Sequence, residues 1–320
     1  MNNQIIIRNE AFLLEESKSF SIPIMRLKPP LKSPVLCQYN LNKLLDIIED
    51  ANDLSIQDKC DYMDALVFGL SQRQTDEVLL KTLLELPSDE TKKFYHYPWV
   101  IKLFNGLDEH EKALCLHYCG IMKTGMKKYL GTTIVDMADM DDYCYYSAGV
   151  VGEFLTGLLF YAYQLSERDF KELPALSRHV GLLLQKTNNL RDYYEDTYIL
   201  KKSRWPQSVT DSHSPLQSLN ILCKDALVND ALPAIRYLEV LPHSDRPFEN
   251  FVRFVLYLSI NHVLRMINNP DVLTAEKLKL PSSYIFSLYK QASRKSRADC
   301  ARELYLSCQQ GIAAFSTLNL

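Results

Sequence analysis

Two short acidic segments are the parts of this sequence whose residue types and spacing could do chemistry. They share the spacing Asp-x-x-Glu-Asp and consist of Asp46, Glu49, Asp50, Asp192, Glu195 and Asp196. On a helix, residues three and four positions apart share one face, so each triplet would gather three carboxylates. A single cluster of this kind usually faces water. Two identical clusters in one chain instead predict an oxygen-lined site for divalent cations.

The second cluster continues a polar stripe along its predicted helix. Gln185 and Asn188 precede it at helical steps, and the stripe begins beside the apolar residues 182–184. Polar groups that start inside an apolar run are expected to point into a cavity rather than only into water. Mg²⁺ suits such a site, because it binds few carboxylates and completes its shell with water and phosphate oxygens.

The elements that must position these residues are expected to be helices. Apolar residues recur at three- and four-residue spacing, and we find no convincing strand-like alternation. The ten glycines are few for an all-β fold. We therefore predict one all-α domain over residues 1–320. Its long helices are predicted over 41–53, 112–130, 143–165, 178–197 and 248–268, with helix ends marked by Pro98, Pro174, Pro206, Pro242 and Pro281.

Charge and hydropathy exclude several functional classes. The net charge of −3 lacks the basic footprint of a nucleic-acid-binding protein. The N-terminus has no basic start followed by a long apolar run, and no uninterrupted apolar stretch reaches about 18 residues. We expect a cytoplasmic protein without a transmembrane segment, which touches membranes at most peripherally.

The eight cysteines are scattered along the chain. Cys115 and Cys119 lie one helical turn apart with His117 between them, which looks superficially like part of a zinc site. No matching pair of ligands occurs elsewhere in the sequence. Buried free thiols in a reducing compartment are the better interpretation.

Four stretches resemble one known family. They are Ser17-Lys18-Ser19-Phe20, residues 46–50, residues 143–152, and residues 184–196 continuing to Trp205-Pro206-Gln207. Together they resemble the squalene/phytoene synthase family over most of the chain, from about Ser17 to about Asn269. The Leu-Gln-Lys-Thr-Asn run and the Trp-Pro-Gln tail resemble squalene synthases in particular.

The resemblance implies an isoprenoid-synthase-type helical bundle around a central cavity. It implies a transferase that joins two farnesyl diphosphate molecules head to head to presqualene diphosphate, using Mg²⁺, and reduces that product to squalene with NADPH. The two acidic clusters would hold Mg²⁺ ions that promote departure of the first diphosphate. Tyr143 would help remove a proton during cyclopropane closure. The catalytic set would be Tyr143, Asp46, Asp50, Asp192 and Asp196.

Further side chains would bind substrate and cofactor by the same resemblance. Diphosphate oxygens would be bound by Ser17, Lys18, Ser19, Lys43, Gln185, Asn188 and Arg191. NADPH would be bound by Lys201, Lys202, Arg204, Lys277 and Lys279. Which of the three basic residues in 201–204 contacts phosphate stays open. The small residues Ala148, Gly149 and Gly152 fit either close helix packing or room for a prenyl chain.

The sequence also departs from the squalene synthases. Ala51 stands where they usually have a further Asp, and Lys18 and Lys43 stand where Arg is common. Neither the Pro-Gln pair expected near Val255 nor the Lys-Gly element expected within 277–281 is clear. The alternatives are an enzyme that makes presqualene diphosphate or a dehydrosqualene- or phytoene-type product without NADPH, a catalytically silent scaffold relative, and a class I terpene cyclase or chain elongase.

Overall fold

The regular structure is helical throughout the residues that the structure describes. The computed structural model describes residues 3–166, 171–242, 245–275, 278 and 280–315, and it contains no strand within these ranges. The predicted all-α class is confirmed. The chain divides into two compact units, residues 1–131 with 157–162 and residues 132–156 with 163–320. Each unit is described by itself, and one domain over residues 1–320 stays a prediction.

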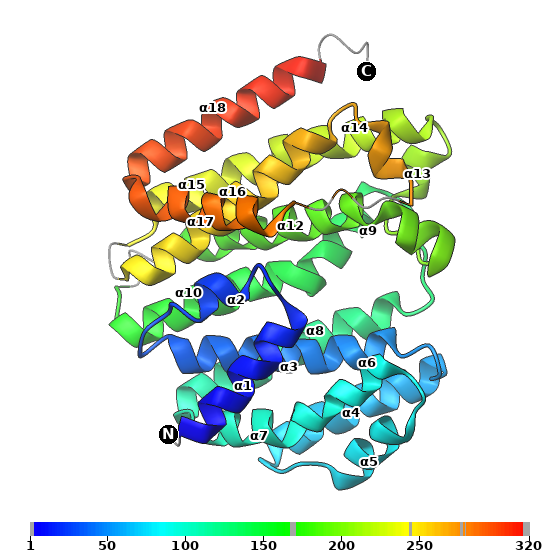
Figure 1. The fold of residues 1–320 in the computed structure, drawn as a ribbon, viewed down its shortest axis with the longest axis vertical. Helices are drawn as coiled ribbons and strands as arrows, with labels where there is room; N and C mark the ends of the chain where they lie inside the picture. The colour runs from blue at the N-terminus through cyan, green and yellow to red at the C-terminus, as the bar shows by residue number, and fades with distance from the viewer. Residues whose placement is uncertain (1–2, 167–170, 243–244, 276–277, 279, 316–320) are drawn as a thin grey trace. The chain divides into compact units, whose positions relative to one another are not determined.

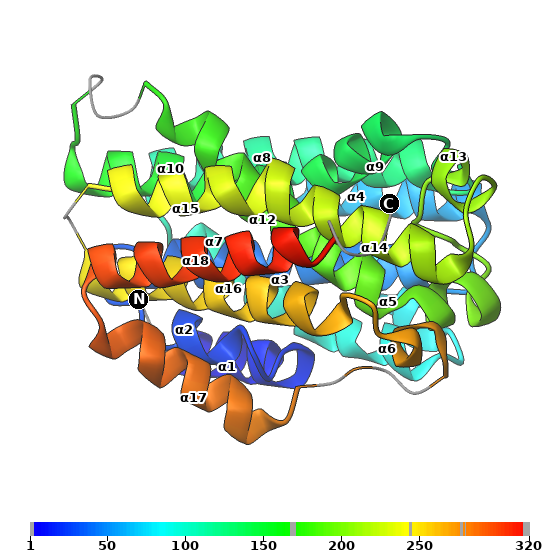
Figure 2. The same cartoon turned by 90° about the horizontal axis from the view of Figure 1, so that it is seen from above.

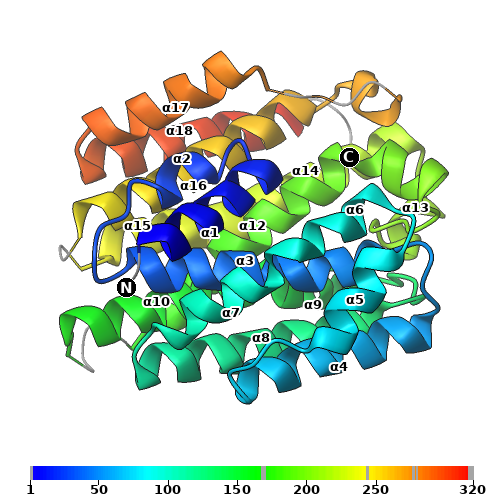
Figure 3. The same cartoon turned by 60° about the horizontal axis from the view of Figure 1, so that its bottom comes forward.

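The first unit is built around helix α3. Its helices are α1 (Asn3–Glu16), α2 (Ser21–Ile24), α3 (Lys32–Asp50), α4 (Ile56–Ser71), α5 (Glu77–Glu85), α6 (Asp89–Lys92), η1 (Lys93–His96), α7 (Tyr97–Asn105) and α8 (Glu109–Tyr129). α3 packs against α1, α7 and α8, and α4 packs against α8 (Figure 1, Figure 3). The buried face of α3 carries Leu41, Leu44 and Ile48, each at most 1% exposed. The first acidic triplet therefore sits on the helix with the most neighbours in this unit.

The second unit is built around helix α12. Its helices are α9 (Met137–Cys144), η2 (Tyr145–Gly149), α10 (Val150–Tyr163), α12 (Leu173–Arg191), η3 (Glu195–Ile199), α13 (Gln207–Thr210), α14 (Pro215–Asp225), η4 (Ala226–Ala231), α15 (Leu232–Val240), α16 (Arg246–Met266), η5 (Pro270–Leu273), α17 (Ser282–Arg294) and α18 (Arg297–Phe315), with 157–162 of α10 in the first unit. α12 packs against η2, η4, α15 and α16, and α18 packs against α15 and α16 (Figure 2). This helix leads directly into the second acidic triplet.

Two of the predicted long helices differ from the structure at a π-helical turn. The helix predicted over 143–165 begins earlier, at Met137, and contains the π-helical turn η2 between α9 and α10. The prediction over 178–197 is wrong at its end, because α12 stops at Arg191 and the wider turn η3 follows. A π turn inserts one residue without changing the apolar pattern much, so periodicity did not reveal either turn. The predictions over 112–130 and 248–268 match α8 and α16 closely, and 41–53 lies mostly within α3.

Prolines mark the starts of helices more often than their ends. Pro98 and Pro174 lie in the first turns of α7 and α12, while Pro206 and Pro281 are the N-cap residues of α13 and α17. The first turn tolerates proline because its amide has no intrahelical partner there. Pro242 follows the end of α15, as expected.

Glycines allow α12 to approach η2 and α10 closely. A Cβ atom at Gly181 would lie 2.1 Å from the backbone oxygen of Ala148, and one at Gly152 would lie 2.1 Å from that of Ser177. At Gly149 the nearest obstacle would be a methyl group of Leu182, at 2.7 Å. Close helix packing, the first of the two interpretations of these small residues, therefore accounts for them.

The cysteines that resembled a zinc site are buried thiols. Cys115 and Cys119 both lie on the buried face of α8, and Cys119 accepts a hydrogen bond from Gln38 Nε2 at 3.4 Å. Burial raises the pKa of the Cys119 thiol, so it stays protonated. Separately, no helix within the described residues has the length and hydropathy needed to cross a bilayer.

Candidate active site

The first acidic triplet occupies the last turn of α3. Asp46 and Glu49 are partly exposed and Asp50 is exposed, and this turn contains no basic residue. The helix dipole makes the C-terminal end of a helix unfavourable for negative charge. Three carboxylates at this end are therefore unfavourable unless cations lie beside them, and the Lys59 ammonium of α4 donates to the Glu49 carbonyl oxygen in this turn at 2.5 Å.

Lys43 lies one turn before this triplet and pairs with it. Its ammonium is 2.7 Å from Asp46 Oδ2 and 4.0 Å from a carboxylate oxygen of Glu16. Burial lowers the pKa of Lys43, but the charge and hydrogen bond of Asp46 together with the charges of Tyr39 and Glu16 outweigh burial, and the pKa is raised overall. Lys43 thus remains a cation beside Asp46.

Tyr39 is a neighbour of this group that the sequence analysis missed. Burial raises its pKa to about 12, while Lys43 and a hydrogen bond with Ser17 act in the opposite direction. Tyr39, Lys43, Asp46 and Asp50 follow one another at helical steps, so an extended stripe search would have found it. Its phenol links the predicted diphosphate residue Ser17 to the α3 group.

Residues 17–20 form the turn between α1 and α2. The Ser17 hydroxyl accepts a hydrogen bond from the Phe20 amide at 2.9 Å and lies 3.4 Å from the Ser19 hydroxyl. Lys18 is exposed. Of the predicted diphosphate residues in the first unit, Ser17 and Lys43 are therefore linked through Tyr39, whereas Lys18 points to solvent.

The second acidic triplet begins where α12 ends. Asp192 is the C-cap residue, and its amide donates to the Asn188 carbonyl at 2.9 Å. The Asp196 amide donates to the Asp192 carbonyl, also at 2.9 Å, so the helical step is kept across the break. Gln185 donates to the Asn189 side chain at 3.0 Å. The backbone spacing of the predicted stripe thus survives the end of the regular helix.

Arg191 presents its guanidinium to the neighbouring carboxylate. Its Nε and Nη2 atoms lie 3.1 and 2.5 Å from the two oxygens of Asp192. His262 on α16 is buried, and burial together with the charge of Arg191 lowers its pKa to about 4. His262 is therefore neutral near pH 7, and no residue spacing pointed to it.

The basic segment after η3, residues 201–204, is held by hydrogen bonds to the second triplet before it and, through Trp205, to α12 after it. The Lys202 amide donates to the Asp196 carbonyl at 2.7 Å, and Lys201 has a left-handed backbone with φ of 54°. Trp205 is 1% exposed and donates from its indole to the Asn189 carbonyl at 3.0 Å. The guanidinium of Arg204 lies 4.3 Å from the centre of the Tyr143 ring, a cation–π arrangement. Of the three basic residues in 201–204, Arg204 is thus the one placed against Tyr143.

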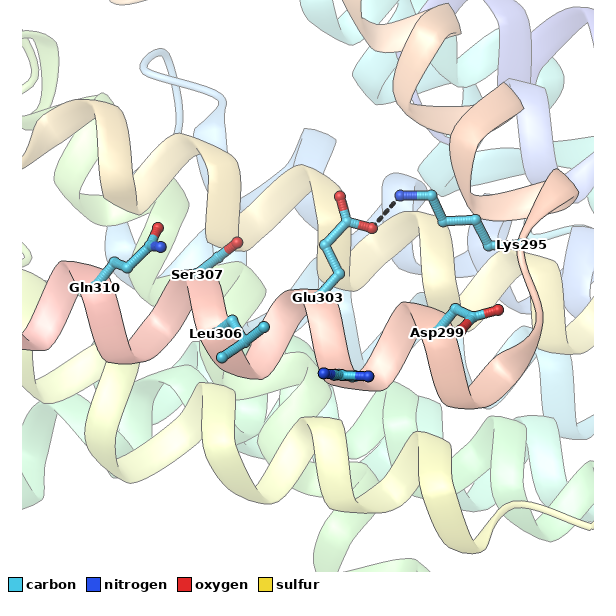
Figure 4. Close-up of a pocket in the computed structure, with 7 residues that line it drawn as sticks. Lys295, Asp299, Glu303, Leu306, Ser307 and Gln310 are labelled. Atoms are coloured by element: carbon cyan, nitrogen blue, oxygen red, sulfur yellow. Dashed lines mark hydrogen bonds and ion pairs between the residues drawn. The ribbon is translucent and has the colours of Figure 1, made fainter.

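Several predicted residues lie apart from these groups. Lys277 and Lys279 fall outside the described residues. Asp46 belongs to the first unit and Asp192 to the second, so their facing one another across a cavity stays a prediction. A cavity of about 500 Å³ opens along α18, beside Lys295, Glu303 and Leu306 (Figure 4), and no predicted site residue lines it.

The donor atoms of both triplets fit Mg²⁺. Carboxylate oxygens are its preferred protein ligands, and side chains that are partly exposed leave room for water and phosphate oxygens to complete the shell. Asp46 lies beside Lys43 and Asp192 lies beside Arg191. A diphosphate bound next to either carboxylate would also accept hydrogen bonds from the same basic side chain.

A model of the squalene/phytoene synthase family matches residues 13–236, which include both triplets, the Tyr143 segment and the Trp-Pro-Gln tail. This chain belongs to that family. Squalene synthase LSS of Botryococcus braunii is 28% identical over 272 residues, covering 80% of this chain and 57% of that protein. The squalene synthase of Dictyostelium discoideum is 28% identical over 277 residues, covering 82% of this chain and 64% of that protein. The chain thus spans less than two thirds of the length of these relatives.

Two solved structures share the fold of this chain. Two structures of TcSQS, each in complex with a ligand, match with TM-scores of 0.74 and 0.75. They are 21% and 22% identical in sequence, and the match covers 98% of this chain and 99% of theirs.

Proposed function

We propose that this chain is a squalene synthase that joins two farnesyl diphosphates head to head. Presqualene diphosphate forms first with Mg²⁺, and NADPH then reduces it to squalene. The observation that carries the proposal is the placement of two acidic triplets with the same spacing. The first ends α3, the central helix of its unit, and the second directly follows α12, the central helix of the other unit. The names of the similar relatives support it.

The chain's own residues bind and orient the diphosphates. Asp46, Glu49 and Asp50 in one unit, and Asp192, Glu195 and Asp196 in the other, are the proposed Mg²⁺ ligands. Bound Mg²⁺ would supply Lewis-acid activation of the diphosphate leaving group. Lys43 and Arg191 already lie beside a triplet carboxylate, at 2.7 and 2.5 Å, so each is positioned to donate to diphosphate oxygens as well. Ser17, Lys18, Ser19, Gln185 and Asn188 complete the proposed set.

Tyr143 and the basic segment serve the later steps in this proposal. The Tyr143 phenol would relay the proton lost in cyclopropane closure to a diphosphate oxygen, and the Arg204 guanidinium against its ring would orient it. Lys201, Lys202 and Arg204 offer cations for the phosphates of NADPH, which when bound would supply the hydride of the reductive step. We also propose that the enzyme is cytoplasmic and contacts membranes only peripherally, when its apolar product leaves.

Incubation with farnesyl diphosphate and Mg²⁺, with and without NADPH, tests the proposal. We expect presqualene diphosphate without NADPH and squalene with it, identified by mass spectrometry. An enzyme whose product is the same in both reactions is a condensing enzyme only. Substitution of the Pro-Gln pair by Val255-Leu256, both buried in α16, favours that second candidate. The absence of any coupled product would refute both.

A further inference from the structure

Lys186 is a buried cation in the middle of α12. Its side chain is 0% exposed. Its ammonium lies 2.6 Å from Asp141, 2.6 Å from Asp225 and 2.7 Å from Asp230. These carboxylates come from three different segments, α9, the end of α14 and η4. One lysine thus ties α12 to three neighbouring elements within the second unit.

The lysine meets one carboxylate for each of its N–H groups, and its contact with Asp225 is also a hydrogen bond. An ammonium carries three N–H groups, and three carboxylates surround it. Burial lowers the pKa of Lys186, but the three surrounding carboxylates together outweigh burial and raise it overall, so the lysine stays charged. His179 lies 2.9 Å from Asp230 and adds a polar partner on the far side of the cluster. A buried charge paired in this way is costly to disturb, because each partner left behind would be an unpaired ion.

The α9 end of this cluster carries the proposed catalytic tyrosine. α9 runs without a break through η2 into α10, and its side chains contact α12. Asp141 binds Lys186, and the Cys144 thiol accepts from the Asn189 side chain at 3.5 Å. Both contacts lead from α9 to α12. Tyr143 lies between these two attachment points.

We propose that Lys186 is a positioning residue, which holds Tyr143 in register with the acidic segment after α12 through its ion pair with Asp141. This inference rests on the proposed function of Tyr143 and Asp192. Asp225 and Asp230 keep the ammonium in place from the other side, but neither lies on the helix that carries Tyr143.

Two single substitutions separate positioning from ordinary stabilisation. Asp141→Asn removes the carboxylate on α9, and Asp225→Asn removes an equally close carboxylate on α14. The Asp141 side chain is 47% exposed and that of Asp225 is 14% exposed, so a purely structural role predicts the larger effect at Asp225. We expect Asp141→Asn to lower kcat for presqualene diphosphate by about ten- to a hundredfold with KM within twofold of wild type. Asp225→Asn is expected to lower the melting temperature while kcat stays within about threefold, and Asp141→Glu to recover most of the lost rate.

Hydrogen exchange gives a readout that does not depend on turnover. Asp141→Asn should speed amide exchange in residues 137–149, and Asp225→Asn should leave that segment close to wild type. Equal loss of kcat in the two variants, or unchanged exchange over 137–149 in Asp141→Asn, would overturn the inference. A wild-type protein that makes no coupled product would refute the proposed function instead, while the exchange result would still decide whether Lys186 holds α9 in place.

Discussion

At the scale of single residues, the six carboxylates of the two triplets are chemically alike but sit in different surroundings. Asp46 and Asp192 each pair with a basic neighbour, whereas the last turn of α3 around Asp50 contains no basic residue. Lys59 of α4 donates from its ammonium to the Glu49 carbonyl oxygen of this turn, at 2.5 Å. If the triplets hold Mg²⁺ as proposed, we expect function at these positions to depend on charge more than on side-chain volume.

Asp50→Asn and Asp192→Asn test the role of the triplets directly. Each substitution removes one negative charge with almost no change in volume, so we expect a folded protein with at least a hundredfold less product. Product formation from farnesyl diphosphate measures the loss, and circular dichroism serves as the control for folding. Turnover near the wild-type rate in both variants would show that these carboxylates do not hold the metal.

His262 predicts a specific acid sensitivity of the fold. Its pKa is about 4 in the folded protein, against about 6.5 when unfolded. Between these values the unfolded chain binds more protons, so stability falls as the pH drops from about 6.5 to about 4, by roughly 3 kcal/mol for this group. Urea unfolding at pH 7 and pH 5 should show a smaller difference for His262→Gln than for wild type. Identical pH dependence of the two proteins would contradict this prediction.

At the scale of elements, the contact of α12 with η2 and α10 positions the second triplet. The close approach requires glycine at two points, because the obstacles at Gly152 and Gly181 are backbone atoms that cannot change rotamer. Arg253 of α16 holds the end of another helix in this unit. It donates to the carbonyl of Lys295, the C-cap residue of α17, at 2.8 Å. Helix ends in this unit are thus held by particular side chains rather than by apolar contact alone.

Gly181→Ala and Gly120→Ala form a matched pair of helix substitutions. The first adds a methyl group 2.1 Å from the Ala148 oxygen, whereas nothing lies within 4 Å of the corresponding position at Gly120 in α8. We expect the first to destabilise the protein by about 3 kcal/mol or more, through overpacking. The second should stabilise it by up to about 1 kcal/mol, from the helix propensity of alanine. Chemical unfolding measures both, and a neutral Gly181→Ala would mean that α12 can move away.

At the scale of the whole molecule, proposed ligand binding links the acidic triplets to stability. Anything that binds only the folded state raises the free energy of unfolding, by about 2.7 kcal/mol at a hundredfold excess over Kd. Inorganic pyrophosphate with Mg²⁺ is the simplest probe of the proposed diphosphate site.

We expect Mg²⁺ and pyrophosphate together to raise the melting temperature by several degrees, and either one alone to have little effect. Metal and diphosphate each complete the other's coordination, so the effect should require both. Differential scanning calorimetry of wild type and Asp50→Asn makes the comparison. An equal shift in the variant would place the binding elsewhere.

Local pattern was sufficient for much of the fold and for the candidate ligands. Helices α8 and α16 were predicted almost to their ends, because an apolar face repeats at fixed spacing along each of them. The two triplets were found for the same reason, since residues three and four apart share a helix face. Pattern did not reveal the π turns at η2 and η3, where a single extra residue widens the helix without changing its apolar composition.

The surroundings of the ionisable groups were decided by tertiary structure alone. In the sequence, Lys186 stands out only as a member of the Leu-Gln-Lys-Thr-Asn run of residues 184–188. Its partners lie on three segments far from it along the chain. The neutral state of His262 likewise depends on its burial beside Arg191. Electrostatic energy depends on distance through space and on the loss of water, and neither quantity is written in residue spacing. The sequence by itself therefore determined the all-helical class, most of α8 and α16 and the spacing of the two acidic triplets, and only the tertiary structure decided which charges meet.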